Sequence, residues 1–186
     1  MESKKLLIAL VALSCFSSVA AESPHRLEVR GALGTIDASK EQGSSTEELN
    51  DLSSGHIGIA YNYKLNKTFS LGIEKLSGDS EAFVEISDLF TDSKLDYDLV
   101  NIVGLAEFAI SERNEVYGKL IASQYDYDVL DDGQVVGSND GSSIGFGIGW
   151  RYTFDLGIGV SMGYEVISLG DDVDLRGISW ALSYQF

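Results

Sequence analysis

Residues able to carry acid–base or nucleophilic chemistry are scarce in this chain. It contains two histidines, His25 and His56, and a single cysteine, Cys15. A histidine acts as a general base when a serine or an acid stands within reach, and no His-x-Ser or comparable set occurs here. One cysteine excludes a disulfide framework and a multi-cysteine metal site. We therefore expect no catalytic residue, no metal site and no cofactor, with His56 as a general base the weaker alternative.

A second chemically notable set consists of charged residues at alternate positions of otherwise apolar segments. Four are basic and four are acidic: Arg26, Glu28, Arg30, Glu74, Glu107, Lys119, Arg151 and Glu165. If they share the inside of a fold, their equal numbers predict a network of ion pairs, because a buried charge is costly unless it is paired. We interpret the set as structural filling. A narrow or gated ion path is the alternative.

The remaining charge is strongly acidic. The chain of 186 residues carries 13 Lys and Arg against 29 Asp and Glu, a formal net charge of −16. This balance argues against nucleic acid as a partner, because phosphate binding needs clustered basic residues. Nearly all the excess lies in four polar segments, 36–54, 77–97, 125–142 and 168–176. These predict an acidic surface for divalent cations or a basic partner, although simple solvation would also explain them.

The first segment is typical of an export signal. In residues 1–21, Lys4 and Lys5 precede an apolar run, and small residues follow it. This pattern predicts a secretory signal peptide cleaved after Ala20 or Ala21. A lipoprotein signal acylated at Cys15 is the alternative. The mature domain is then 22–186.

Alternation with period two dominates the rest of the chain. In 143–152 every second residue is large and apolar, and the residues between are mainly Gly or Ser. In 98–110 two parities compete, and we place Val100, Ile102 and Phe108 on the apolar face, which leaves Glu107 on the polar one. Such alternation predicts strands. We expect eight strands, which lie near 26–34, 56–63, 69–76, 98–110, 116–124, 143–152, 157–166 and 178–186.

The residue sizes indicate which face points outward. The interior of an eight-stranded barrel is barely wide enough for side chains. Rows of Trp, Tyr and Ile would overfill it, so the apolar face must point outward, where only lipid tolerates it. We therefore predict an all-β fold, an eight-stranded antiparallel up-and-down transmembrane β-barrel.

The connections alternate between long and short, as in barrels with short periplasmic turns and long outer loops. Matching parity places three-residue turns at 65–67, 112–114 and 153–155, and Asp132-Gly133 is a hairpin signal within the third long loop. The second turn sets Glu107 opposite Lys119. An aromatic girdle is expected at the periplasmic level, formed by Tyr61, Tyr63, Phe69, Phe108, Trp150, Tyr152, Tyr184 and Phe186.

With these features the sequence resembles small eight-stranded outer-membrane barrels of the OmpA membrane-domain and OmpX type. The most specific part is the end, Gly177-Ile-Ser-Trp-Ala-Leu-Ser-Tyr-Gln-Phe186. It is similar to the signal that such proteins offer to the outer-membrane assembly machinery, with Gly177, Trp180, Leu182, Tyr184 and Phe186 as its residues. The resemblance implies a Gram-negative outer membrane, with lipid and lipopolysaccharide as surroundings.

For function we expect a non-enzymatic barrel with a structural or adhesion-type role, acting through its acidic loops. Two alternatives remain open. A lipid A-modifying enzyme would need an outward-facing catalytic histidine. A small ion channel would need a continuous wet lumen.

Overall fold

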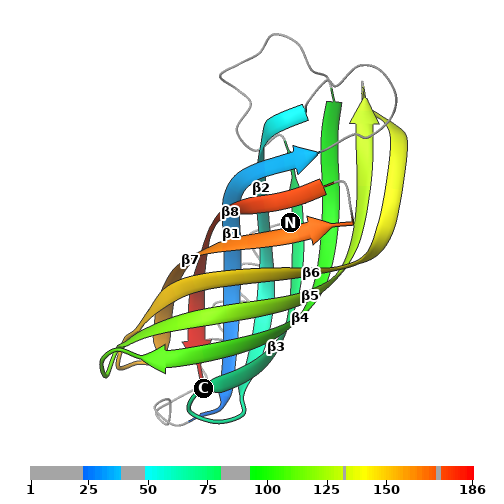
Figure 1. The fold of residues 1–186 in the computed structure, drawn as a ribbon. Helices are drawn as coiled ribbons and strands as arrows, with labels where there is room; N and C mark the ends of the chain where they lie inside the picture. Colours follow the sequence, from blue (N-terminus) through cyan, green and yellow to red (C-terminus); the bar gives the residue numbers. More distant parts are fainter. Residues whose placement is uncertain (1–22, 39–48, 81–92, 132, 171–172) are drawn as a thin grey trace, which may run out of the picture.

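Eight antiparallel strands close into a barrel in the computed structural model, which describes residues 23–38, 49–80, 93–131, 133–170 and 173–186 (Figure 1). Each strand pairs with the next, and β8 pairs with β1. This confirms the predicted fold class. The described residues contain no helix that is long and apolar enough to cross a membrane. The strands are β1 (His25–Ala38), β2 (Leu49–Lys64), β3 (Phe69–Asp79), β4 (Ser93–Ala109), β5 (Asn114–Asp131), β6 (Gln134–Thr153), β7 (Ile158–Leu169) and β8 (Val173–Gln185). The predicted signal peptide, 1–21, lies outside the described residues.

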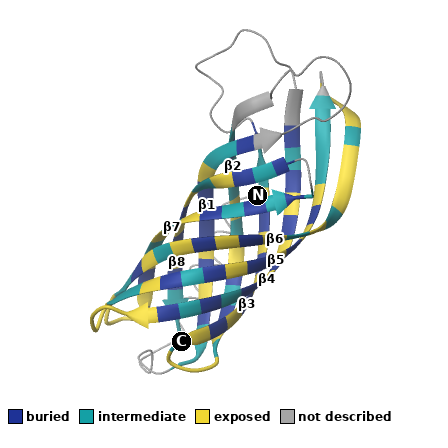
Figure 2. Cartoon of the chain, in the orientation of Figure 1, coloured by how far each residue is buried: buried dark blue, intermediate teal, exposed yellow. Residues whose placement is uncertain are grey.

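Burial alternates along the strands within the barrel wall, so each strand shows one face to the lumen and one to the outside (Figure 2). The outer part of β6 differs, because residues 134–140 are almost all exposed. The ambiguous strand β4 follows the predicted parity. Val100, Ile102 and Phe108 are 46%, 60% and 56% exposed, whereas Leu99 and Val103 are fully buried. Large apolar side chains thus cover the outer wall, which only a lipid environment stabilises.

The three short turns lie at one end of the barrel, but their registers differ from the predicted ones. Each turn leaves four residues between its strands, at 65–68, 110–113 and 154–157. The backbone explains the difference. The Asn66 side chain accepts hydrogen bonds from the amides of Thr68 and Phe69 at 2.8 and 2.9 Å, and Gly157 takes the left-handed position with φ 77°. Each register moves by an even number of positions, so the predicted faces stay correct.

At the opposite end, hereafter the outer end, β5 and β6 form the longest hairpin. The predicted Asp132-Gly133 turn is confirmed, because Asp131 pairs with Gln134 and Gly133 has φ 72°. The hairpin rises beyond the end of β7 (Figure 1).

The lumen is packed more fully than the sequence pattern indicates. It holds an apolar cluster that extends from the ion-paired region toward the outer end and includes Leu76, Leu99, Val103, Ile121, Ile167, Leu169 and Leu175. Lower down, Tyr117 fills the interior beside β6. A Cβ atom on Gly149 would lie 2.4 Å from the Tyr117 ring, so glycine makes room for this side chain. The small residues of β6 therefore accommodate large ones from β5, a pairing that alternation within one strand does not predict.

Candidate functional site

The eight charged residues singled out in the sequence all lie buried in the lumen. Nearest the short turns, Arg26 contacts Glu28 at 2.9 Å and Glu107 at 2.7 Å. Arg151 contacts the same two carboxylates at 3.4 and 2.5 Å. The hydroxyl of Ser70 donates a further hydrogen bond to Glu107 at 2.6 Å. Arg151 also lies 3.5 Å from Glu115, which pairs with Lys64 at 3.6 Å near the short turns. The two buried cations and two buried anions cancel, and so does this additional pair.

The other four charged residues form a second neutral group farther up the lumen. Lys119 contacts Glu74 at 2.9 Å and Glu165 at 3.1 Å, and Arg30 bridges the same two carboxylates. Ser179 donates a hydrogen bond to Glu165 at 3.0 Å. Every described carboxylate of the network therefore meets at least two cations, an arrangement that offsets the cost of burial.

The predicted direct pairing of Glu107 with Lys119 is wrong. Glu107 lies opposite Tyr117, and Lys119 lies opposite Leu105. The reason is that the turn is centred one residue earlier than predicted, which shifts the register by two. The amide of Ile110 donates to the carbonyl of Asn114 at 2.8 Å, and the amide of Asn114 donates to the Ser111 hydroxyl at 3.2 Å. The shift leaves both side chains in the lumen but assigns them to different groups of the network.

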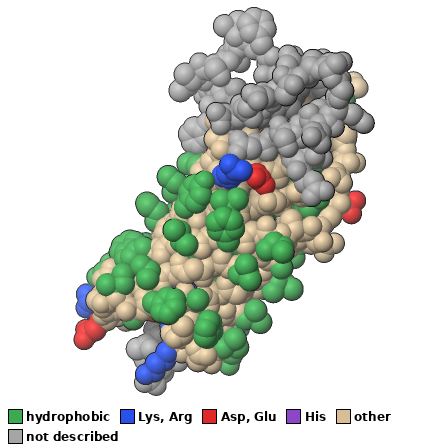
Figure 3. Space-filling view, viewed as in Figure 1, with side chains coloured by type: hydrophobic (Ala, Val, Ile, Leu, Met, Phe, Trp, Pro, Cys, Tyr) green, Lys and Arg blue, Asp and Glu red, His purple; other side chains and the backbone are tan. Residues whose placement is uncertain are grey.

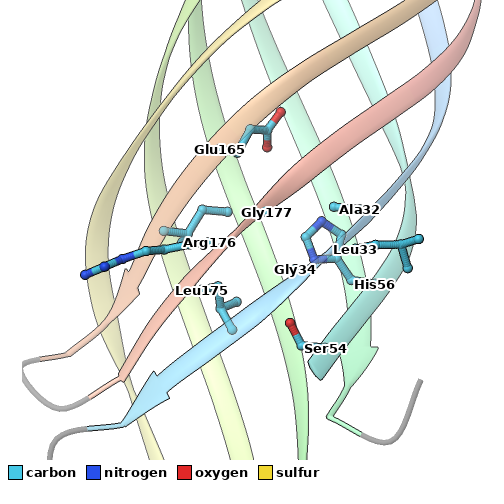
Figure 4. Close-up of a pocket in the computed structure, with 10 residues that line it drawn as sticks. Ala32, Leu33, Gly34, Ser54, His56, Glu165, Leu175, Arg176 and Gly177 are labelled. Carbon is cyan, nitrogen blue, oxygen red and sulfur yellow. The ribbon is translucent and has the colours of Figure 1, made fainter. Parts of the chain in front are cut away.

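His56 faces the lumen near its outer half, where it lines a cavity of about 20 Å³ (Figure 4). Its Nδ1 lies 3.2 Å from the Tyr97 hydroxyl. Ser54, Glu165 and Arg176 line the same cavity, and the guanidinium end of the Arg176 side chain extends away from His56. A space of this size holds one or two water molecules and no lipid chain. His56 therefore lacks the outward-facing position that lipid chemistry needs.

His25, the other histidine, lies at the seam between β1 and β8. Its Nδ1 is 2.6 Å from the Tyr61 hydroxyl, and its ring stacks on Phe186 at 5.7 Å between centroids. The amide of Phe186 donates to the carbonyl of His25 at 3.0 Å. The end of the chain is thus held against the start of the barrel. Trp180 and Leu182 of the expected assembly signal face outward, while its role in assembly stays a prediction.

Aspartates line up across the outer ends of β3 to β6, on the outward face. One row joins Asp98, Asp126 and Asp140 as cross-strand partners. The adjacent row joins Asp79, Asp96 and Asp128. We call these six residues the acidic face. Directly opposed like charges are unfavourable within a sheet, so this surface favours a ligand of opposite charge.

Five of these six residues lie in the acidic segments 77–97 and 125–142, and Asp98 lies just beyond the first. The second segment also holds Asp131 and Asp132. Asp132 lies outside the described residues. The sequence did not predict that these aspartates form rows across neighbouring strands. A signal was present in the period of two, because the alternation of Tyr and Asp in 125–128 continues the strand beyond the apolar belt. Among the described residues, no group of three or more His, Cys, Asp or Glu is arranged to hold a metal ion.

Charge and apolarity are separated along the wall. In the view of Figure 3, hydrophobic side chains are spread over the barrel wall, and charged ones lie near its two ends. On β8, partial burial alone would raise the pKa of Asp174, but hydrogen bonds from Arg176 and Ser168 outweigh it and lower the pKa. This carboxylate at the outer end therefore keeps its negative charge.

Comparison with known families agrees with this geometry. The outer membrane protein beta-barrel domain matches residues 6–186. The chain belongs to this family. It is therefore an outer-membrane protein. In such barrels the short turns and both termini face the periplasm, so the acidic face lies toward the outside.

Solved structures of the same shape include several small bacterial barrels. Neisserial surface protein A has 15% identity and a TM-score of 0.69, and the match covers 88% of this chain and 98% of that one. Ail, the attachment invasion locus protein of Yersinia pestis, has 19% identity, a TM-score of 0.58, and coverage of 89% and 99%. OprG from Pseudomonas aeruginosa has 11% identity, a TM-score of 0.57, and coverage of 91% and 99%. No curated protein matches the sequence. At these identities the likeness shows the fold.

Proposed function

We propose that this barrel is a non-enzymatic surface-interaction protein, which binds a basic partner through the acidic face. The observation that carries the proposal is the two transverse rows of aspartates above the apolar belt. Asp98, Asp126 and Asp140 are exposed on the outward side of the sheet. A one-sided field of this kind attracts cationic surfaces and steers their approach.

The charge distribution supports a partner at the surface rather than in the lumen. The interior charges cancel within two ion-paired groups, so the lumen offers no net attraction to a charged ligand. The acidic face, by contrast, carries a net negative charge, because its rows place aspartates side by side. Divalent cations are the smaller alternative ligand. The absence of a metal-holding group among the described residues favours a basic macromolecule instead.

The structural neighbours add a contrast. Ail is named as an attachment invasion locus protein, and one of its structures contains the heparin analogue sucrose octasulfate. That ligand is polyanionic. The acidic face of this chain is negatively charged and attracts cations instead. We therefore propose the general role of surface attachment, with a cationic partner.

The enzyme and channel alternatives have weaker support. His56 points into a lumen cavity and contacts Tyr97, away from lipid. The lumen is filled by ion pairs and by apolar side chains packed beside and above them.

The proposal is tested by removing charge from the acidic face without touching the barrel wall. The variant Asp126→Asn/Asp140→Asn is reconstituted in lipid nanodiscs and titrated with a fluorescent ten-residue lysine peptide. We expect binding about tenfold weaker at low salt, which corresponds to about 0.7 kcal/mol for each exposed charge. The affinity of the unchanged protein should fall as salt rises, because screening acts over about 8 Å at physiological ionic strength.

The matched control is Glu112→Gln/Asp155→Asn, which removes the same charge from the periplasmic turns. Both residues are exposed. The control should bind the peptide as the unchanged protein does. Equal loss in both variants would mean that only net charge matters, and no loss in either would refute the acidic face as a binding surface.

A further inference from the structure

Strand β6 has an unpaired edge at its outer end. Its ladder with β5 runs from Tyr152 up to Gln134. Its ladder with β7 stops at the pair of Gly145 with Ile167. Within the part of the chain that the structure describes, residues 134–144 therefore pair on one side only. We call this segment the open edge.

The hydrogen-bonding direction along the open edge follows from the turn below it. The amide of Thr153 donates to Arg113, on the β5 side, and the amide of Phe154 donates to Ile158, on the β7 side. In an antiparallel sheet this direction alternates from one residue to the next. The even-numbered residues Ser138, Asp140 and Ser142 therefore direct their N–H and C=O groups toward the open edge.

Such an edge can accept an added strand, because it presents backbone donors and acceptors in a regular array. Side chains at the open edge leave room for one. The outward positions 138, 140 and 142 carry Ser, Asp and Ser, and the positions between them carry Asn and Gly. Within this segment the large, apolar and exposed residues are Val135 and Val136 at the tip and Ile144 at the base, where the ladder with β7 begins.

Charge decides which strand fits. A second copy of this chain, paired edge to edge, would place its own aspartate row beside Asp126 and Asp140. Directly opposed like charges are destabilising. A strand with basic residues on its outward face would instead extend the row Asp98, Asp126, Asp140 with an opposite charge.

We propose that the open edge binds an extended, basic segment of another protein as an added antiparallel strand. This inference rests on the proposed function and deepens it, since it names the partner as a peptide segment with basic residues at alternate positions. Those residues lie opposite Ser138, Asp140 and Ser142. In an antiparallel pair, they also supply the backbone groups that bond to β6.

That geometry allows a test in which charge and strand pairing are separated. A ten-residue peptide of alternating lysine and valine is titrated against the full protein in nanodiscs. N-methylation of every lysine amide removes the donors that face β6, whereas N-methylation of every valine amide removes donors on the far edge. Both peptides keep the same charge. We expect the lysine-methylated peptide to bind at least tenfold more weakly, and the valine-methylated peptide to bind like the unmodified one.

The protein side is tested with Ser142→Pro, which deletes one edge donor, and with Ser142→Ala as its control. Proline is tolerated on edge strands where its missing N–H faces solvent, so the barrel should still fold, as checked by its heat-dependent migration on gels. We expect Ser142→Pro to weaken peptide binding about tenfold and Ser142→Ala to leave it unchanged. Should Ser142→Pro misfold, the two methylated peptides are sufficient to decide between strand addition and simple charge attraction.

Equal binding of the two methylated peptides would overturn strand addition. The proposed function would then stand or fall separately, because Asp126→Asn/Asp140→Asn tests charge without changing the backbone of the open edge. Loss of binding in that variant, together with equal binding of both methylated peptides, would leave the acidic face as the site and remove the added strand.

Discussion

Buried charges in the lumen divide into two groups that are each neutral. In the upper group, Lys119 lies between Glu74 and Glu165 at 2.9 and 3.1 Å, and its side chain is almost wholly buried. Removing one member of such a group leaves an opposite charge buried without compensation, which is far costlier than replacing a whole pair. The network therefore acts as a set of mutually dependent side chains rather than as independent ion pairs.

A substitution at Lys119 measures this dependence. Lys119→Met should lower the free energy of unfolding by about 3 kcal/mol, because it leaves the upper group with excess negative charge. The double variant Lys119→Met/Glu165→Gln restores neutrality, with Arg30 still beside Glu74, and should recover part of the loss. Urea unfolding in lipid vesicles gives the four free energies of the double-mutant cycle. Additive losses would show that the two residues do not interact.

At the scale of elements, the periplasmic ends of the strands differ from their outer ends in the contacts that they make. The periplasmic end of β8 is joined to β1 through Phe186, whose amide bonds to His25 and whose ring stacks on it. The outer ends of β5 and β6 extend beyond β7 and carry half of the acidic face, and β6 provides the open edge. One end of the sheet is thus closed by aromatic contacts, and the other presents an open backbone edge and charge.

The last strand provides a test of assembly. Deleting Phe186, or changing Tyr184 and Phe186 to serine, should reduce the amount of folded barrel in the outer membrane several-fold. The reasons are the terminal aromatic pattern and the contact of Phe186 with His25. Gln185→Ala, next to them on the opposite face, should have a smaller effect. Quantitative blots of outer-membrane fractions make the comparison. Normal levels of the truncated protein would contradict an assembly signal at this end.

At the scale of the whole molecule, the barrel is a filled cylinder with its charge separated along its length. The outer wall is apolar, the buried charges of the lumen are paired and cancel, and an apolar cluster packs beside them and fills the lumen toward the outer end. A cavity of about 10 Å³ lies within the ion-paired region, and the cavity of about 20 Å³ beside His56 reaches this region at Glu165. Together they hold only a few water molecules, which is too little for a continuous aqueous path.

The filled lumen predicts the electrical behaviour of the barrel. Purified protein in a planar bilayer should give no steady conductance above that of the bare membrane, because a hydrated ion would have to displace Leu99, Val103 and Ile121. Substituting Val103 and Ile121 with alanine should not open a path by itself, since the ion-paired region below stays closed. A stable conductance from the unchanged protein would revive the channel alternative.

The sequence by itself determined the fold class, the strand count and the face of each strand. The reason is local: side chains alternate with period two, and an eight-stranded lumen cannot hold rows of large residues. The same parity placed all eight interior charges, and also Val100 and Ile102 on the lipid side of β4.

Only the tertiary structure decided which of those charges meet. Glu107 and Lys119 were placed on the correct face, yet a turn centred one residue earlier than predicted shifted the register by two and moved them into different groups. Parity is conserved when a register slips by two, so the pattern carries no information about such a slip. The acidic rows depend on the registers between β3, β4, β5 and β6. The open edge depends on where the ladders of β6 with β5 and with β7 end. Both are set by pairing between strands, which the sequence of a single strand does not determine.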